Sequence, residues 1–485
     1  MRAMMVPIAV TLVGMAFAPG AGAAALDRGR KPVPGPTPAI ATPRITRTTL
    51  ANGLPVWVVS RHGLPVVSVL VQIRAGSAQD DAHPGLAAMT AALLDEGSAK
   101  HSALEFAQAT SFLGASLVAS SGYEQTSISL LTLTRHLDAG LGLLGEMLVG
   151  PSFKPEEVER ERTSRLQSLK QARDVASTTA DRVFNMVALG ADHPYGRPPA
   201  GTLASIAAIT RDDVLGYFGS FYRPNNAVVI VVGDVTAEAI VPRLESALGA
   251  WTAAPLPAGS RDVPAKPAAK PTAVYLVDKP GAAQSEIRIG HAGAPRTADP
   301  DYYALQVLNT VLGGQFTSRV NLNLREKHGF TYGARSTWAF RRGAGPFVAS
   351  SGVFTAKTDS ALVEFIKEIR DVRGARPITA DEVEFARNAL QRGYPRRFET
   401  DDGIADVLAD FTLYELPESE ISNFPAQIGR VRAEDATRVA KAYIAPDRLA
   451  IVVVGDLAKI RPGIEALELG PISVLDAEGK PVAAK

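Results

Sequence analysis

Two kinds of hydrophobic spacing alternate along this chain. The segment PVVSVLVQIRAG (65–76) places β-branched residues at alternating positions and predicts a strand. Helical spacing follows from Leu86 to Asp95, and ALEFAQATSFLGA (103–115) predicts a second helix with Phe106 and Phe112 on its apolar side. Strands and helices do not follow strict βαβ order, so the pattern favours an α+β fold with antiparallel pairing.

The next segments continue the mixture. SLVASSGYEQTSISLLTLT (116–134) alternates and predicts one or two strands with a turn at Ser121 and Gly122. Residues 136–150 predict a helix, and PEEVERERTSRLQSLKQARDVAST (155–178) predicts a long, heavily charged one. Each half of the chain therefore combines a sheet with several helices.

The second half of the chain resembles the first. FYRPNNAVVIVVGDVTAEAI closes one half and YIAPDRLAIVVVGDLAKI closes the other. Pro224 and Pro446 are 222 residues apart, as are Gly233 and Gly455. Two matches at one offset indicate an internal duplication.

The duplication predicts a two-domain architecture. We expect homologous domains at 44–251 and 274–470, each a mainly antiparallel sheet flanked by helices. The stretch 252–273 is rich in Pro, Ala and Lys and predicts a linker that joins the domains into a clamshell.

The N-terminus predicts export. Arg2 precedes the apolar run MMVPIAVTLVGMAFA and a small-residue stretch, which is typical of a secretory signal over 1–23. A Pro-rich leader over 24–43 follows, and we expect a periplasmic or secreted protein. An uncleaved anchor is the alternative. No later stretch has the ~18 uninterrupted apolar residues of a spanning helix.

Composition excludes several functions. Lys plus Arg total 51 and Asp plus Glu total 50, so charge gives no reason to expect nucleic-acid binding. The absence of cysteine excludes disulfides and thiolate chemistry. A serine nucleophile elbow and phosphate-binding glycine loops are missing from the sequence. No two of the seven histidines lie three or four residues apart, although a helical zinc site needs two ligands on one face; the histidines are His62, His83, His101, His136, His193, His291 and His328.

One unusual stretch remains, VLNTVLGGQFTSRVNLNLREKHGFTYGARST (307–337). Its pattern predicts a helix that breaks at Gly313 and Gly314, restarts, and brings Arg325 and Tyr332 around a turn at Gly329. An arginine offers a fork of donors to a carbonyl or carboxylate, and a tyrosine can donate to a developing oxyanion. From the residues alone, a surface loop with an ordinary Arg and a packed Tyr is the favoured interpretation.

Several stretches together resemble the insulinase/pitrilysin-like metallopeptidases, in the short bacterial and processing-peptidase-like branch. They are GSAQDDAHPGLAAMTAALLDEGS, HPYGRPPAGTLASIAAITRDDVLGYFGSFYRPNNAVVIVVGD and LGGQFTSRVNLNLREKHGFTYG, and the resemblance extends from about Arg44 to Gly463. Active members carry zinc on H-x-x-E-H, with the glutamate as general base.

The resemblance implies that this chain has lost its zinc ligands. The H-x-x-E-H frame falls on GLAAMTAAL, where Ala88, Ala91 and Ala92 replace the two histidines and the glutamate. The third ligand position is Ser168, and Glu161 matches only a supporting glutamate. We therefore expect no metal cofactor in this chain and no peptide cleavage by the chain alone.

The same resemblance assigns a role to Arg325 and Tyr332. In the family an arginine and a tyrosine seven residues apart hold the substrate backbone and stabilise the tetrahedral intermediate, and these two residues match. It implies a non-zinc subunit that completes a composite site with a zinc-bearing homologous partner, for short or unfolded peptides. An inactive peptide-binding protein, a structural subunit and an unrecognised metal site are the alternatives.

Overall fold

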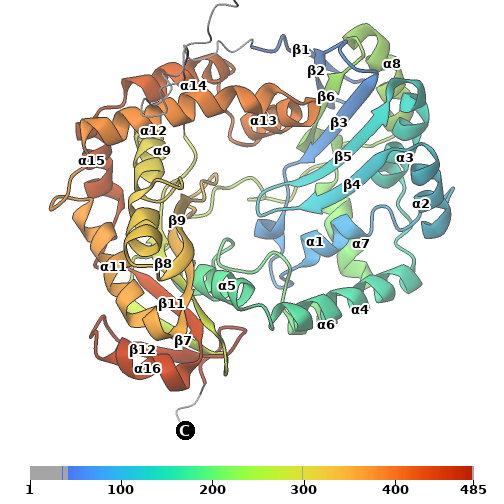
Figure 1. The fold of residues 1–485 in the computed structure, drawn as a ribbon. Coiled ribbons are helices and arrows are strands. Elements are labelled where there is room, and N and C mark those ends of the chain that lie inside the picture. Colours follow the sequence, from blue (N-terminus) through green and yellow to red (C-terminus); the bar gives the residue numbers. More distant parts are fainter. Residues whose placement is uncertain (1–34, 36–41, 298, 483–485) are drawn as a thin grey trace, which may run out of the picture. The chain divides into compact units, whose positions relative to one another are not determined.

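Two six-stranded, mainly antiparallel sheets carry the fold (Figure 1). The computed structural model describes residue 35, residues 42–297 and residues 299–482. The chain divides into two units, Met1–Thr37 and Pro38–Lys485, and everything below concerns the second. The predicted signal at 1–23 and nearly all of the predicted leader at 24–43 lie outside the described residues.

The two sheets have equivalent strand orders. The N-terminal sheet runs β1-β2-β6-β3-β5-β4 and the C-terminal sheet runs β12-β7-β11-β8-β10-β9. Pairing is parallel for β2 with β6, β7 with β11 and β12 with β7, and antiparallel elsewhere. The strands are β1 Thr46–Thr49, β2 Pro55–Ser60, β3 Val66–Ile73, β4 Ser116–Ser121, β5 Thr126–Leu133, β6 Ala227–Gly233, β7 Ala273–Asp278, β8 Gln284–Ala292, β9 Thr331–Trp338, β10 Pro346–Phe354, β11 Ala450–Gly455 and β12 Ile472–Leu475. The expected α+β class is confirmed.

Helices cover one face of each sheet and connect its strands. Those of the first half are α1 Leu86–Ala92, α2 Ala103–Phe112, α3 Leu137–Val149, α4 Pro155–Ala172, α5 Ala176–Leu189, α6 Leu203–Ala208, α7 Arg211–Phe221 and α8 Ala237–Leu248. Those of the second half are α9 Pro300–Leu312, α10 Arg319–Asn321, the π-helix η4 Leu322–Lys327, α11 Thr358–Asp371, α12 Ala380–Gly393, α13 Asp401–Leu413, α14 Ser419–Arg430, α15 Ala433–Tyr443 and α16 Leu457–Glu465. Short 3₁₀ turns are η1 Ser77–Gln79, η2 Thr134–His136, η3 Pro224–Asn226, η5 Thr355–Lys357 and η6 Tyr394–Phe398.

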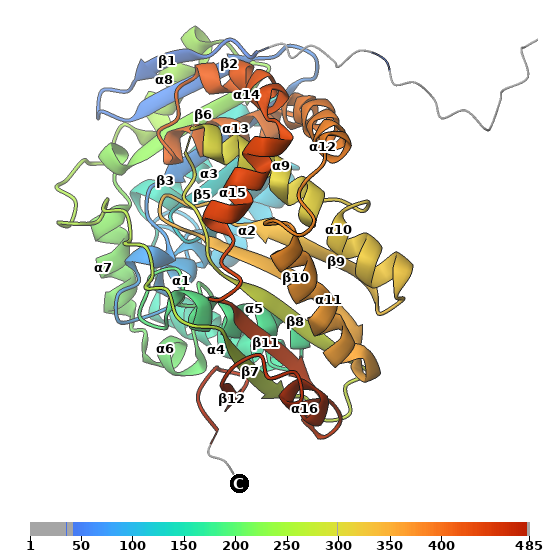
Figure 2. The same cartoon turned by 90° about the vertical axis from the view of Figure 1, so that its left-hand side faces the viewer.

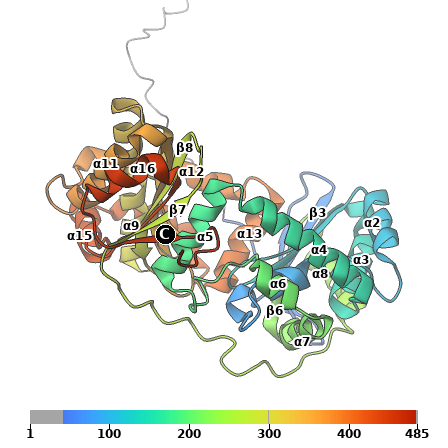
Figure 3. The same ribbon diagram turned by 90° about the horizontal axis from the view of Figure 1, so that it is seen from below.

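The second face of each sheet is covered by a helix from the other half. Helix α13 packs its apolar side, including Leu408, on β3 and β6 (Figure 1). Helix α5 lies against the C-terminal sheet (Figure 3). Its Val183 and Phe184 belong to the apolar cluster that α5 shares with this sheet, where the helix contacts β8 and β11. Because both faces are covered, the central strands are buried almost throughout, as near-continuous apolar runs require.

Two sequence expectations are wrong in detail. The charged helix expected over 155–178 is two helices, because the chain turns at residues 173–175 and α5 leaves for the other sheet. Phe112 is 88% exposed, whereas Phe106 is buried. Six residues are about one and two-thirds helical turns, so the two rings cannot share one narrow face of α2.

We call α5 and α13 the exchanged helices, because each packs on the sheet of the other half. Polar contacts also hold α13 on the first half. Arg61 pairs with Asp401 at 2.8 Å, and the Ser68 hydroxyl donates to Asp402 at 2.6 Å. Arg74 donates to the carbonyl of Thr412 at 2.8 Å. Within the described ranges, none of the helices combines the length and the apolar character needed to cross a bilayer.

Candidate functional site

The alanine face of the first half lies on α1, where that helix packs against α4. Ala91 is buried, and Ala88 and Ala92 are half-buried. Ser168, the remaining position of the zinc frame, is exposed on α4. These four side chains supply three methyl groups and one hydroxyl, which is not a donor set that holds zinc.

A guanidinium bridges α1 and α4 beside the alanines. Arg165 donates from Nη2 to the carbonyl of Ala88 at 2.8 Å and forms an ion pair with Glu161 at 2.7 Å. Both charged side chains are largely buried, and Glu161, Arg165 and Ser168 follow one face of α4 at helical spacing. Across the part of the chain that the structure describes, no three His, Cys, Asp or Glu side chains gather as metal ligands. The fixed positive charge of the Arg165 guanidinium at this place opposes the binding of a metal cation.

A buried aspartate holds the beginning of α1. Asp80 accepts hydrogen bonds from the backbone N–H groups of Gly85 at 2.7 Å and Ala87 at 2.8 Å. Burial raises the pKa of Asp80 to about 7, against the opposing effect of these two donors. The helix that carries the alanines is therefore anchored by a group that titrates near neutrality.

In the second half, Arg325 and Tyr332 line one cavity of about 520 Å³. Arg325 comes from the π-helix η4, and Tyr332 is the second residue of β9. Gly329 between them has a φ of +63°, which suits the turn that joins the two elements. The structure therefore brings the two predicted residues together. The full lining is Ser177, Glu286, Arg288, Gly313, Gly314, Gln315, Phe316, Asn321, Arg325, Tyr332, Gly333, Ala334, Arg335, Ser350, Ser351 and Gly352.

The two predicted residues are both accessible. The guanidinium of Arg325 lies 4.4 Å from the ring centre of Phe316, and its Nε lies 3.4 Å from a carboxylate oxygen of Glu326. Tyr332 is 77% exposed and rests edge-on against Phe354. The alternative of a packed tyrosine is therefore wrong, because this ring and its hydroxyl face solvent.

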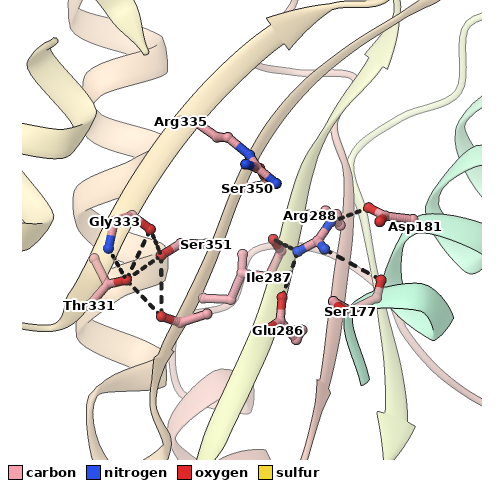
Figure 4. Close-up of polar contacts among 11 residues, drawn as sticks. Ser177, Asp181, Glu286, Ile287, Arg288, Thr331, Gly333, Arg335, Ser350 and Ser351 are labelled. Atoms are coloured by element: carbon pink, nitrogen blue, oxygen red, sulfur yellow. Dashed lines mark hydrogen bonds and ion pairs between the residues drawn. The ribbon is translucent and has the colours of Figure 1, made fainter. Parts of the chain in front are cut away.

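Sheet side chains form the floor of the cavity (Figure 4). Arg288 is buried on β8 and pairs with Asp181 of α5 at 2.5 Å and with Glu286 at 2.9 Å. Burial lowers the pKa of Arg288, but the two carboxylates outweigh it and raise that pKa above its ordinary value. Arg335 of β9 donates to the hydroxyl of Ser350 on β10 at 3.3 Å. The exchanged helix thus contributes a charged partner to a site in the other half.

Two family profiles match the chain. The profile described as Insulinase (Peptidase family M16) matches residues 56–194, and the one described as Peptidase M16 inactive domain matches residues 208–390. Together they include more than half of the chain, which belongs to the insulinase family, peptidase family M16.

Relatives and solved structures agree with this assignment. An uncharacterized zinc protease of Streptomyces coelicolor is 27% identical, over 85% of this chain and 90% of its own length. The non-peptidase homolog YmxG of Helicobacter pylori is 26% identical, over 84% of this chain and 93% of its own. A peptidase M16 inactive domain from Pseudomonas fluorescens has the same fold, with a TM-score of 0.79 at 24% identity over 85% of this chain and 98% of that one. With alanines at its zinc positions, the chain is an inactive-type homologue of this family.

Sequence reasoning missed the rest of the cavity. Arg288 and Glu286 lie two residues apart in the strand SEIRIGHA, and this pair of opposite charges between apolar residues was the available signal. In the first half, outside this cavity, Arg165 was also missed, because it is one of many charged residues on α4. Asp181 gave no signal, because nothing local to the sequence shows that α5 crosses to the other sheet.

Proposed function

We propose that this chain is the non-zinc subunit of a heteromeric insulinase-type metallopeptidase. It lends Arg325 and Tyr332 to a composite site that hydrolyses short or unfolded peptides. The observation that carries the proposal is that both side chains line one open cavity, while the alanine face of α1 has no ligand atoms. The zinc, with the water it activates, would belong to a homologous partner subunit.

The two side chains suit complementary tasks. The Arg325 guanidinium is braced by Phe316 and keeps donors available for a peptide carbonyl. The Tyr332 hydroxyl is a neutral donor at the cavity mouth, and it can stabilise the negative charge that develops on the carbonyl oxygen under attack. Removing one such donor typically lowers kcat by about 10²–10³-fold.

The test combines this chain with a homologue from the same genome that carries H-x-x-E-H. Each chain alone and the mixture are assayed on a quenched fluorescent peptide. We expect hydrolysis only in the mixture, and a loss of about 10²–10³-fold in kcat/KM for Arg325→Ala and for Tyr332→Phe. Arg430→Ala is the matched control, because Arg430 is an exposed arginine of α14. Chelator-sensitive hydrolysis by the single chain would contradict the proposal, as would a mixture no more active than the partner alone.

A peptide-binding protein without catalytic duty is the second candidate. It is favoured by the Helicobacter pylori relative that is named a non-peptidase homolog. In that case the mixture gains no activity, but the cavity still binds peptides. Export to the periplasm or medium remains part of the proposal, and cell fractionation of the full-length chain tests it.

A further inference from the structure

Three arginines line the cavity, but their charges are compensated unequally. Arg288 has two carboxylates within 3 Å. Arg325 has only Glu326, at 3.4 Å and half-exposed. Arg335 has no carboxylate within ion-pair distance anywhere in the described ranges, and its one hydrogen bond goes to a neutral hydroxyl, that of Ser350. The cavity therefore carries an uncompensated positive charge at Arg335, while Arg325 has a single, exposed ion-pair partner.

The strand register places Arg335, Ser350 and Arg288 in a row across β9, β10 and β8. Ser350 of β10 stands opposite Arg335 on β9 and opposite Arg288 on β8. These three side chains lie on adjacent strands, which Figure 2 shows side by side. Figure 4 shows the side chains themselves. Strand β9 is at the edge of the sheet, so no further strand pairs with its outer side. The Arg335 side chain is exposed. Its guanidinium is open to a ligand.

One glycine leaves part of the neighbouring floor bare. A Cβ at Gly333 would meet only Asn321 Oδ1, at 3.8 Å, so packing within the chain does not require glycine there. At Gly352, across a register shift between β9 and β10, a Cβ would instead meet the Glu286 carboxylate at 2.8 Å, so this glycine makes room for a side chain of the protein itself. The nearby hydroxyls of Thr331 and Ser351 already bond to each other and to backbone carbonyls. Glycine in a strand without an internal reason often marks the close approach of another backbone.

We propose that this floor is a carboxylate-binding subsite, in which Arg335, together with Arg325, selects peptides that carry an acidic group. A guanidinium matches a carboxylate with two parallel hydrogen bonds, and the bare glycine floor gives the peptide backbone room beside it. The carboxylate comes from an Asp or Glu side chain or from a free C-terminus. The inference rests on the proposed function only in that the cavity receives peptides.

Binding to the single chain tests this without a partner or hydrolysis. Four rhodamine-labelled Gly/Ser decapeptides are compared by fluorescence anisotropy. They carry three central Glu or three central Gln residues, each with a free or an amidated C-terminus. We expect a carboxylate-bearing peptide to bind about tenfold or more tightly than the Gln amide. Tighter binding of the Glu peptides identifies the acidic side chains as the source of the carboxylate, and tighter binding of the peptides with a free C-terminus identifies the terminal carboxylate.

Variants assign the preference to Arg335. In Arg335→Gln we expect the preference to fall by about tenfold, and Arg335→Lys to retain part of it, because lysine keeps the charge but not the fork. Arg430→Gln should leave it unchanged, since Arg430 lies on α14 outside the cavity lining. Equal binding of the four peptides, no saturable binding of any, or a preference that survives Arg335→Gln would overturn the inference. None of these outcomes decides whether the mixture with a zinc-bearing partner hydrolyses peptides.

Discussion

The two halves place different structures after their equivalent strands β3 and β8. In the first half α1 ends at Ala92, and Arg165 bridges it to α4 beside three alanines. In the second half α9 ends at Leu312, and two glycines and a π-helix then deliver Arg325 to an open cavity. Equal strand order therefore does not imply equal chemistry. The local helix geometry delivers Arg325 to a cavity in the second half.

The exchanged helices differ in the same way. Helix α13 meets the first sheet through a mainly apolar cluster that includes Leu70, Ile230 and Leu408. Helix α5 meets the second sheet beside the buried guanidinium of Arg288, which it pairs with Asp181. The registers Leu70↔Ile230 and Arg288↔Val452 show that Leu70 and Arg288 occupy equivalent strand positions. Both exchanged helices thus bury apolar surface and bring a carboxylate to an arginine, but the arginine that α5 meets is buried, whereas Arg61, which α13 meets, is 37% exposed.

The most direct test of the difference between the halves is to rebuild the zinc frame of the first half. A chain with Ala88→His, Ala91→Glu, Ala92→His and Ser168→Glu recovers the ligands, but the Arg165 guanidinium still lies beside them. We expect zinc affinity by calorimetry to rise about tenfold or more when Arg165→Gln is added, because a nearby cation is removed.

One control variant accompanies this rebuilding. Arg160→Gln removes a charge from the same helix, but Arg160 pairs with Glu96 and Glu157 instead of Ala88. It should raise zinc affinity much less than Arg165→Gln does. Equal affinities with and without Arg165 would show that its charge does not oppose the metal. Stoichiometric zinc binding by the native chain would contradict the difference between the halves.

The next effect concerns stability at the exchanged helix α13. Leu408 is fully buried against the first sheet, so Leu408→Ala leaves a cavity. We expect the free energy of unfolding to fall by about 2–5 kcal/mol in urea denaturation. Leu104→Ala is the control, because Leu104 is 68% exposed and should change stability little. A small loss at Leu408 would mean that α13 detaches readily from this sheet.

The smaller of the two expected effects on the free energy of unfolding concerns how α1 and α9 are anchored. Asp80 is buried beneath α1 with a pKa raised by burial to about 7, whereas Asp299 caps α9 from an exposed position. Between about pH 4 and pH 7 the folded state holds a proton at Asp80 that the unfolded state has lost. Stability from this group is therefore fully present below pH 4 and is lost as pH rises to about 7.

The measurement compares pH slopes. We expect unfolding free energy to fall by about 2 kcal/mol more between pH 5 and 8 in the native chain than in Asp80→Asn. Asp299→Asn should keep the native slope. If Asp80→Asn also keeps it, the carboxyl is ionised throughout this range.

Local pattern predicted much of this structure, and long-range packing accounts for what it missed. The strands, the duplicated halves and the helix that breaks at Gly313 were readable from periodicity and glycine placement. The exposure of Phe112, the division of 155–178 into α4 and α5, and the pairing of Asp181 with Arg288 were not. Each of these depends on which distant surface a helix meets. Arg335 was also missed, because one arginine on an alternating strand is ordinary until the register shows its neighbours.

The exchange of α5 and α13 has a consequence for the order in which the chain can fold. β6 ends at Gly233, but the helix that covers its second face begins at Asp401, so this face waits for most of the second half to be synthesised. Contacts so distant in sequence close slowly, and the uncovered apolar strands are open to misassembly meanwhile. Either half produced alone would expose one sheet face to water. The two halves therefore form one cooperative folding unit, although their sequence reads as a tandem repeat.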